Sequence, residues 1–210
     1  MRLNPLALVA ASWVVVLALA SALAALAATH QTLPGDVDIA QWIQDLPVPG
    51  QELSDLVRTV TETEVVLATG GAVVLVLWLR GYRRQAVLLA AGLLAMGVLA
   101  VTLKEIVDRP RPAAELVERR SGFDSTSFPS GHVLSTTVLY GTLIYYGFSL
   151  SLTAVARVGL VLASFLFLTL VGPVSIWLGV HWPSDVAGSW LWALVVVVPI
   201  IVVDQLESSA

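Results

Sequence analysis

The sequence contains no cysteine, which excludes disulfide bonds, thiolate nucleophiles and cysteine-ligated metals. Charged residues make up only 12% of the 210 residues, and the formal net charge of −4 is not concentrated in a basic patch. This distribution gives no indication of nucleic-acid binding, so we predict no nucleic-acid partner. No internal repeat or low-complexity segment is evident, and we expect residues 1–210 to form a single domain.

Apolar residues account for 57% of the chain, and the mean hydropathy is +0.86, well above that of soluble domains. A bilayer core needs about 20 helical residues, and several uncharged stretches approach or exceed that length. The sequence therefore predicts an all-α, polytopic membrane protein with six transmembrane helices. We expect these spans near residues 5–28, 63–82, 85–104, 132–149, 155–178 and 184–203.

The first apolar run follows Arg2 and ends in alanine-rich sequence, as a secretory signal does. Its length of about 23 residues favours an uncleaved anchor instead. The connector 80–84, RGYRR, holds three arginines and is therefore expected on the cytoplasmic side. Segments 29–62, 105–131 and the turn around 179–184 would then lie on the extracytoplasmic face of the cell membrane. Two stretches of 29–62 have helical periodicity and predict short interfacial helices.

The predicted outer side carries six of the eleven basic residues, against the usual positive-inside bias. A bound anion would explain this excess. The six residues are Arg58, Lys104, Arg109, Arg111, Arg119 and Arg120. We interpret Arg58 as an ordinary solvated loop charge.

The stretch GVHWPSDVAG places His181 four residues before Asp185, with Pro183 suited to the first turn of a helix. At that spacing the two side chains can approach on one face. The carboxylate would then orient the imidazole and leave its second nitrogen free as a base or nucleophile. The alternative is a helix-capping aspartate beside an incidental interfacial histidine.

Two further segments carry candidate chemistry at predicted outer span ends. Ser130, Gly131 and His132 stand before the fourth span, where a helix N-terminus offers free N–H groups to an anion. The alternative is a serine cap with an incidental histidine. Lys104, the only lysine, and Arg111 flank a helix end and a proline-rich segment and can converge on a phosphate. An ordinary pair of membrane-edge cations is the alternative here.

The predicted topology brings all three segments to one side of the membrane. Together they supply two cations, a helix N-terminus, two imidazoles and a carboxylate, which suits phosphoryl transfer through a histidine nucleophile. The motifs also resemble those of the type 2 phosphatidic acid phosphatase (PAP2) superfamily of integral membrane lipid phosphatases. The matching residues are Lys104 to Arg111-Pro112, Pro129-Ser130-Gly131-His132, and His181 with Asp185. The resemblance covers nearly the whole chain and implies a PAP2/haloperoxidase-like helical core.

The chain departs from the family pattern at one position. Ser175 stands where the third family motif has an arginine, so one phosphate-binding cation is missing. Losing such a contact can cost about 2–4 kcal/mol of transition-state stabilisation. We predict that Arg109, Arg119 or Arg120 reaches the site in its place.

The resemblance implies a mechanism in which His181 attacks phosphorus, Asp185 orients it, and His132 protonates the leaving oxygen. Lys104, Arg111, Ser130 and Gly131 would bind the phosphoryl oxygens, with no metal and no other cofactor. The expected substrate is a lipid phosphate or pyrophosphate at the bilayer surface, of the undecaprenyl pyrophosphate, phosphatidic acid or phosphatidylglycerol phosphate class. The alternative, prompted by Ser175, is a weakened member that binds or translocates phospholipid. The sequence does not predict an oligomeric state.

Overall fold

The computed structural model describes residues 5–47, 49–123 and 125–208. Within these ranges the chain forms eight α-helices and no β-strand, so the predicted all-α class is confirmed. The helices are α1 (Pro5–Thr29), α2 (Asp36–Gln44), α3 (Gln51–Val60), α4 (Thr63–Leu79), α5 (Arg83–Val107), α6 (Gly131–Ser149), α7 (Ala154–Trp177) and α8 (Pro183–Ser208).

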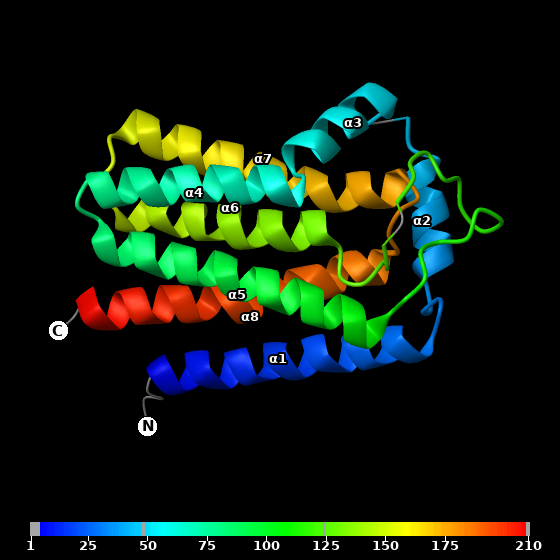
Figure 1. Cartoon of the computed structure of the whole chain (residues 1–210), viewed down its shortest axis with the longest axis horizontal. Coiled ribbons are helices and arrows are strands. Elements are labelled where there is room, and N and C mark those ends of the chain that lie inside the picture. The colour runs from blue at the N-terminus through cyan, green and yellow to red at the C-terminus, as the bar shows by residue number, and fades with distance from the viewer. Residues whose placement is uncertain (1–4, 48, 124, 209–210) are drawn as a thin grey trace.

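The six long helices, α1 and α4 to α8, run side by side along the long axis of the molecule (Figure 1). The short helices α2 and α3 lie at one end of this bundle, and segment 108–130 passes over the same end. We call the end that carries α2 and α3 the α2 end. Both chain termini lie at the opposite end, which we call the terminal end. Because α6 and α8 begin at the α2 end and α5 and α7 finish there, all the predicted site segments arrive at this one end.

Four helices are long and apolar enough to cross a membrane: α1, α5, α7 and α8. Helices α3 and α4 pass the same test only as a pair, bent by 48° at the break between them. The described part of the chain therefore contains four candidate spans, or five if the bent pair counts as one. The predicted count of six spans is not confirmed.

Helix α6 is long enough to span but is too polar to count by composition. It packs against α4, α5, α7 and α8 and so lies at the centre of the bundle. Its buried side chains include Ser135, Thr136 and Thr142, and the Thr142 hydroxyl donates to the carbonyl of Val138 at 2.7 Å. A helix covered by other helices needs no lipid-facing surface, which explains its lower hydropathy.

The start of α8 packs closely on the segment that leads into α6. A Cβ added to Gly188 would lie 2.3 Å from the ring of Phe128, which is completely buried. The Ser189 hydroxyl donates to the backbone carbonyl of Asp185 at 2.7 Å and lies 3.3 Å from the carbonyl of Ser130. It also accepts the backbone N–H of Ser130 at 2.9 Å. These contacts fix the first turns of α6 and α8 side by side.

The turn between α7 and α8 depends on Gly179, whose φ of 68° is in the left-handed region. A Cβ there would stand 2.1 Å from the carbonyl oxygen of Glu118, so only glycine lets segment 118–120 approach. The N–H of Arg120 then donates to the carbonyl of Leu178 at 3.0 Å. This contact holds the short segment that carries His181.

A polar cluster joins α5, α6 and α8 near the terminal end. Asp204, only 2% exposed, accepts hydrogen bonds of 2.8 Å from Arg84, Gln85 and Tyr145. Arg84 also forms an ion pair with it at 2.8 Å. The cluster stabilises the packing of three helices far from the α2 end.

Candidate active site

Asp185 lies in the first turn of α8 and is completely buried. Its Oδ2 accepts the backbone N–H of Trp182 at 2.8 Å, so the carboxylate does cap the helix. The Nδ1 atom of His181 stands 3.7 Å from the same oxygen, just beyond hydrogen-bonding range. Asp185 can therefore cap α8 and orient His181 at the same time, because a small rotation of the imidazole would bring Nδ1 within hydrogen-bonding distance of the carboxylate.

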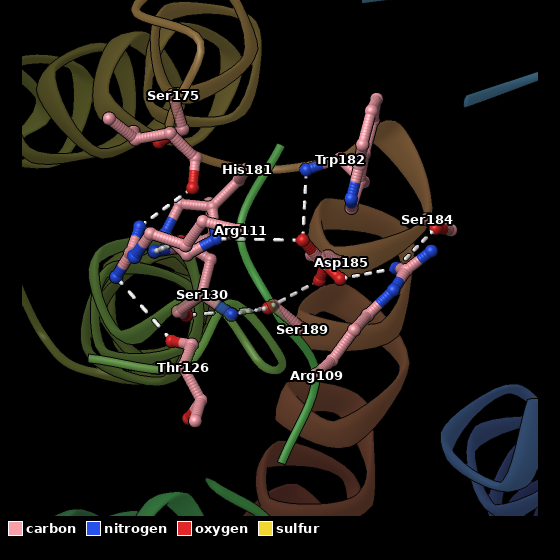
Figure 2. Close-up of polar contacts among 12 residues, drawn as sticks. Arg109, Arg111, Thr126, Ser130, Ser175, His181, Trp182, Ser184, Asp185 and Ser189 are labelled. Carbon is pink, nitrogen blue, oxygen red and sulfur yellow. Dashed lines mark hydrogen bonds and ion pairs between the residues drawn. The ribbon is translucent and has the colours of Figure 1, made fainter. Parts of the chain in front are cut away.

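Arg109 holds Asp185 from the side opposite His181, as Figure 2 shows. Its Nη1 donates to Asp185 Oδ1 at 2.5 Å, and its Nη2 donates to Asp36 Oδ2, from α2, at 2.7 Å. Ser184 accepts from Nη1 at 2.8 Å and itself donates to Asp36. Arg109 is only 1% exposed and has an acid on either side. Arg109 therefore reaches the predicted site, as was expected of one of the three arginines, but it contacts Asp185 and Asp36 and does not line the pocket between the two histidines.

His181 is 2% exposed, and its Nε2 lies 3.3 Å from Nη1 of Arg111. An arginine can only donate, so a hydrogen bond here requires the lone pair on Nε2 and the proton on Nδ1, toward Asp185. Burial lowers the pKa of His181, and the charges of Arg111 and Lys104 act in the same direction, against the contribution of Asp185. His181 is thus a neutral imidazole at pH 7, the form that a nucleophile requires.

Lys104 and Arg111 converge as predicted, on the short segment Ser125–Thr126. Lys104 Nζ donates to the carbonyl of Thr126 at 3.1 Å, and Arg111 donates to the carbonyl of Ser125 at 2.7 Å and to its hydroxyl at 3.0 Å. Arg111 also donates to the carbonyl of Val180, next to His181, at 2.7 Å. All of these partners are neutral oxygens, and neither cation has an ion pair within the described residues.

The charge on Arg111 persists at neutral pH. Burial, together with the nearby positive charges of Arg119 and Arg58, lowers the pKa of Arg111 to about 10, while Asp185 opposes the shift. Arg111 is therefore a partly desolvated cation with no carboxylate bound to it. Such a group attracts anions strongly.

The start of α6 has the geometry expected of a capped helix. Ser130 is completely buried, and its hydroxyl accepts the N–H of Val133 at 3.4 Å, which agrees with the capping alternative. Gly131 faces α4, where an added Cβ would stand 3.2 Å from the hydroxyl oxygen of Thr63. His132 follows, with its ring edge-on to Phe123 at 5.8 Å between centroids. Its Nε2 is buried and has no hydrogen-bond partner among the described residues.

His132 and His181 line the same small pocket, together with Ser175, Thr61, Arg58 and Phe123. The other predicted site residues do not line it, although Arg111 borders it through His181 and Phe123. The pocket has room for only about 10 Å³ of solvent, roughly what one water molecule needs. A phosphoryl group can enter only if a side chain moves, and Phe123 is the side chain on the segment outside the bundle.

Arg58 is not the solvated loop charge that the sequence predicts. It is half-buried, its guanidinium stacks on the Phe123 ring at 4.0 Å from the centroid, and it lines the pocket with Ser175 and both histidines. A signal was present in the sequence, since Ser54, Val57 and Thr61 lie at helical spacing around it. All three are buried, so Arg58 lies beside the inward face of α3.

The two remaining candidates for the missing cation do not reach the pocket. Arg119 is exposed and makes no pocket contact. Arg120 stacks on Trp177, 3.9 Å from the ring centroid, and pairs with Glu118 at 2.7 Å. The prediction that one of these loop arginines replaces the missing motif residue is therefore wrong for both.

Among the described residues, no group of three histidine or acidic side chains is arranged to hold a metal ion. A separate groove of about 800 Å³ lies between α4 and α5, lined by apolar and small residues such as Leu67, Gly71, Leu94 and Val98. No titratable side chain lines this groove, in contrast to the smaller pocket, which two histidines and an arginine line.

Comparison with known proteins identifies the family and the fold. The sequence profile described as PAP2 superfamily matches residues 85–207. No curated protein matches the chain. A solved structure, that of the first transmembrane PAP2 type phosphatidylglycerolphosphate phosphatase from Bacillus subtilis, is similar with a TM-score of 0.69 and 21% sequence identity. The similarity covers 92% of this chain and 96% of that one, so the two share a fold over nearly their whole length.

Proposed function

Because the chain belongs to the PAP2 superfamily, we propose that it is a membrane phosphatase that hydrolyses a lipid phosphate or pyrophosphate through a phosphohistidine. The observation that carries this proposal is that His132 and His181 line one pocket. Nε2 of His132 has no hydrogen-bond partner among the described residues, and Nδ1 of His181 is directed toward Asp185 without reaching hydrogen-bonding distance. Unsatisfied buried nitrogens destabilise a fold, and a reaction that uses both rings gives a reason to retain them.

In the first step, Nε2 of His181 attacks phosphorus while the bond from phosphorus to the lipid or leaving phosphate breaks. The proton on Nδ1 moves toward Asp185, which stabilises the positive charge that develops on the ring. His132, which enters this step as the imidazolium, gives a proton to the leaving oxygen and becomes the neutral base of the second step. In the second step, His132 takes a proton from water, the resulting hydroxide attacks phosphorus, and the N–P bond breaks to release phosphate and neutral His181.

The charge that builds up on the phosphoryl oxygens is met by the cations Lys104 and Arg111 and by Gly131 at the N-terminus of α6. The lipid-binding alternative remains open because Ser175 replaces a family arginine. It is less well supported, because a binding protein needs no nucleophile, and the three-part arrangement of Arg109, Asp185 and His181 serves to orient one.

The substrate is an amphiphile whose head group reaches the α2 end while its chains stay in lipid. The structurally similar Bacillus subtilis protein is a phosphatidylglycerolphosphate phosphatase, but at 21% identity it supports the shared fold rather than a shared substrate. Phosphatidylglycerol phosphate, phosphatidic acid and undecaprenyl pyrophosphate all remain substrates of the proposed class.

The decisive experiment measures phosphate release from dioctanoyl lipid phosphates by the purified protein in detergent. We expect His181→Ala to abolish release. His30→Ala is the matched control, because His30 is exposed and contacts only its own helix end. Equal release by the wild type and His181→Ala would refute the enzymatic proposal, while lipid binding without release by either would favour the alternative.

The proposed topology has six spans, α1 and α4 to α8, with the α2 end on the extracytoplasmic face. Because the sequence has no cysteine, single cysteines can be introduced and labelled with a membrane-impermeant maleimide in intact cells. We expect labelling at Ala114, in segment 108–130, and none at Tyr82, between α4 and α5. The reverse pattern would place the site on the cytoplasmic side.

A further inference from the structure

We propose that Arg58, from α3, supplies the phosphate-binding cation that position 175 lacks. This inference rests on the proposed phosphatase function and adds to it a residue outside the family motifs. Arg58 would act from a helix that the family profile, which begins at residue 85, does not include.

The position of Arg58 supports this role. Helix α3 packs on α7, and Arg58 and Ser175 line the same pocket from these two helices. The Ser175 hydroxyl donates to the carbonyl of Val171 in its own helix at 2.7 Å, so it offers no donor to the pocket. An arginine at position 175 would point into the space that the guanidinium of Arg58 borders from α3.

The guanidinium groups of Arg58 and Arg111 both lie against the ring of Phe123. The guanidinium carbons of Arg58 and Arg111 lie 4.0 and 4.4 Å from the centroid of this one ring. A phosphorus atom bound by two arginines through their N–H groups lies about 4 Å from each guanidinium carbon. Both guanidinium groups therefore border the space that the Phe123 ring fills. If the ring moved away, both side chains could turn their N–H groups toward a phosphoryl group that entered this space.

The charge of Arg58 also supports this role. Arg58 donates to the hydroxyl of Ser121 and, at 3.4 Å, to the carbonyl of Gly122, both neutral groups of the segment that carries Phe123. Within the described residues it has no carboxylate partner. Arg58, Arg111 and Lys104 thus gather around two histidines, and none of the three forms an ion pair with an acid among the described residues. Like charges repel one another unless an anion joins them, and a phosphoryl group is such an anion.

A purely structural role would also account for the contacts with segment 121–123, and the experiment must separate the two roles. We compare Arg58→Gln with Arg119→Gln, which removes an equal charge from an exposed position of the same end. Two quantities are measured for each: kcat/KM on a dioctanoyl lipid phosphate, and the inhibition constant of orthovanadate, which imitates the pentacoordinate phosphorus of the transition state.

We expect Arg58→Gln to lower kcat/KM about 30-fold or more and to weaken vanadate inhibition by a similar factor. Arg119→Gln should change both by less than about threefold. If Arg58→Gln left vanadate inhibition at the wild-type value, the inference would be overturned, whatever happened to the melting temperature. Should Arg58→Gln not fold, Arg58→Lys keeps the charge without the planar fork, and weaker vanadate inhibition is again the expected result.

A rescue experiment sharpens the test. Ser175→Arg places a guanidinium in the same pocket from α7. The double variant Ser175→Arg with Arg58→Gln should therefore have a kcat/KM about tenfold or more above that of Arg58→Gln alone. A structural clamp on segment 121–123 would not be restored from α7, and absence of recovery would count against the inference. Activity lost in Arg58→Gln but retained in His181→Ala would instead refute the proposed function, so the two failures can be told apart.

Discussion

Helix α8 carries two buried aspartates, Asp185 near its start and Asp204 near its end, and their surroundings differ. Asp204 binds an arginine, a glutamine and a tyrosine, each at 2.8 Å, and its cluster has the form of a complete structural brace. Asp185 is held equally firmly by Arg109 and by the N–H of Trp182. Beyond it, however, lie two imidazoles that each keep one unpaired nitrogen, and two cations, Lys104 and Arg111, whose hydrogen-bond partners are neutral groups.

One helix thus carries a stabilising cluster near its end and, in the proposed mechanism, a reactive cluster at its start. A buried polar group normally has a hydrogen-bond partner. The groups described around Asp204 are bonded to it, whereas His132 and His181, near Asp185, each keep one unpaired buried nitrogen. Burial of a charged aspartate alone does not distinguish the two ends. What distinguishes them is whether the groups around the aspartate are satisfied.

The largest effect is expected from removing Arg109, which joins Asp36 and Asp185. Arg109→Met leaves two buried carboxylates without their cation and should lower the free energy of unfolding by about 3–5 kcal/mol. Thermal unfolding in detergent measures this. Adding Asp36→Asn should recover part of the loss, because one of the two unpaired charges is then gone. No recovery would mean that Arg109 matters to the fold through its packing alone.

A matched pair of substitutions tests the two aspartates directly. Asp185→Asn places an amide beside Nδ1 of His181, which favours the tautomer with its proton on Nε2 and so blocks the attack. Phosphate release should fall about 100-fold or more. Asp204→Asn, the same change on the same helix, should leave the rate within about threefold. Equal loss of activity in both would show that the distinction between the two ends is mistaken.

The Asp204 cluster should affect stability more than catalysis. Asp204→Ala leaves Arg84, Gln85 and the Tyr145 hydroxyl without their common acceptor, at a cost of about 1–3 kcal/mol. The melting temperature should fall while KM stays unchanged. A shift in KM would connect the terminal end to the site and would remove the basis for treating it as a brace.

The smallest effect is on the pH profile. Burial lowers the pKa of His181, so the neutral, reactive form persists into mildly acidic solution, and kcat/KM should fall only well below pH 6.5. Arg111→Gln removes a positive charge beside the ring and should move this acid limb to higher pH in the residual activity. A limb that moves to lower pH, or does not move, would show that another group sets it.

Much of the fold follows from the sequence because apolar runs determine long membrane helices. The ranges expected for α1, α5, α7 and α8 agree with the observed ones to within a few residues at most ends. The count of six spans was less secure, because α6 is surrounded by other helices and carries buried serines and threonines in place of lipid-facing apolar residues. High hydropathy is typical of helices that face lipid, and a central helix has little contact with lipid.

The site was predictable only where its residues come from helix ends with fixed spacing. His181 and Asp185 share one helical turn, so their approach follows from local geometry. Arg58 lies on α3, and Arg109 contacts Asp36 of α2. Both helices fold back over the α2 end, and no local sequence pattern shows where such helices pack. The sequence alone therefore predicts neither the contact of Arg109 with Asp185 nor the partial burial of Arg58.

The most direct test of the whole account is to identify the phosphorylated residue by mass spectrometry during turnover. The His132→Ala variant should be mixed with p-nitrophenyl phosphate, whose leaving group needs little help from an acid, and quenched under alkaline conditions that preserve phosphohistidine. The account predicts a phosphoryl group on His181 that accumulates because water is no longer activated. Continued turnover with no phosphate on His181, or phosphate on any other residue, would contradict it.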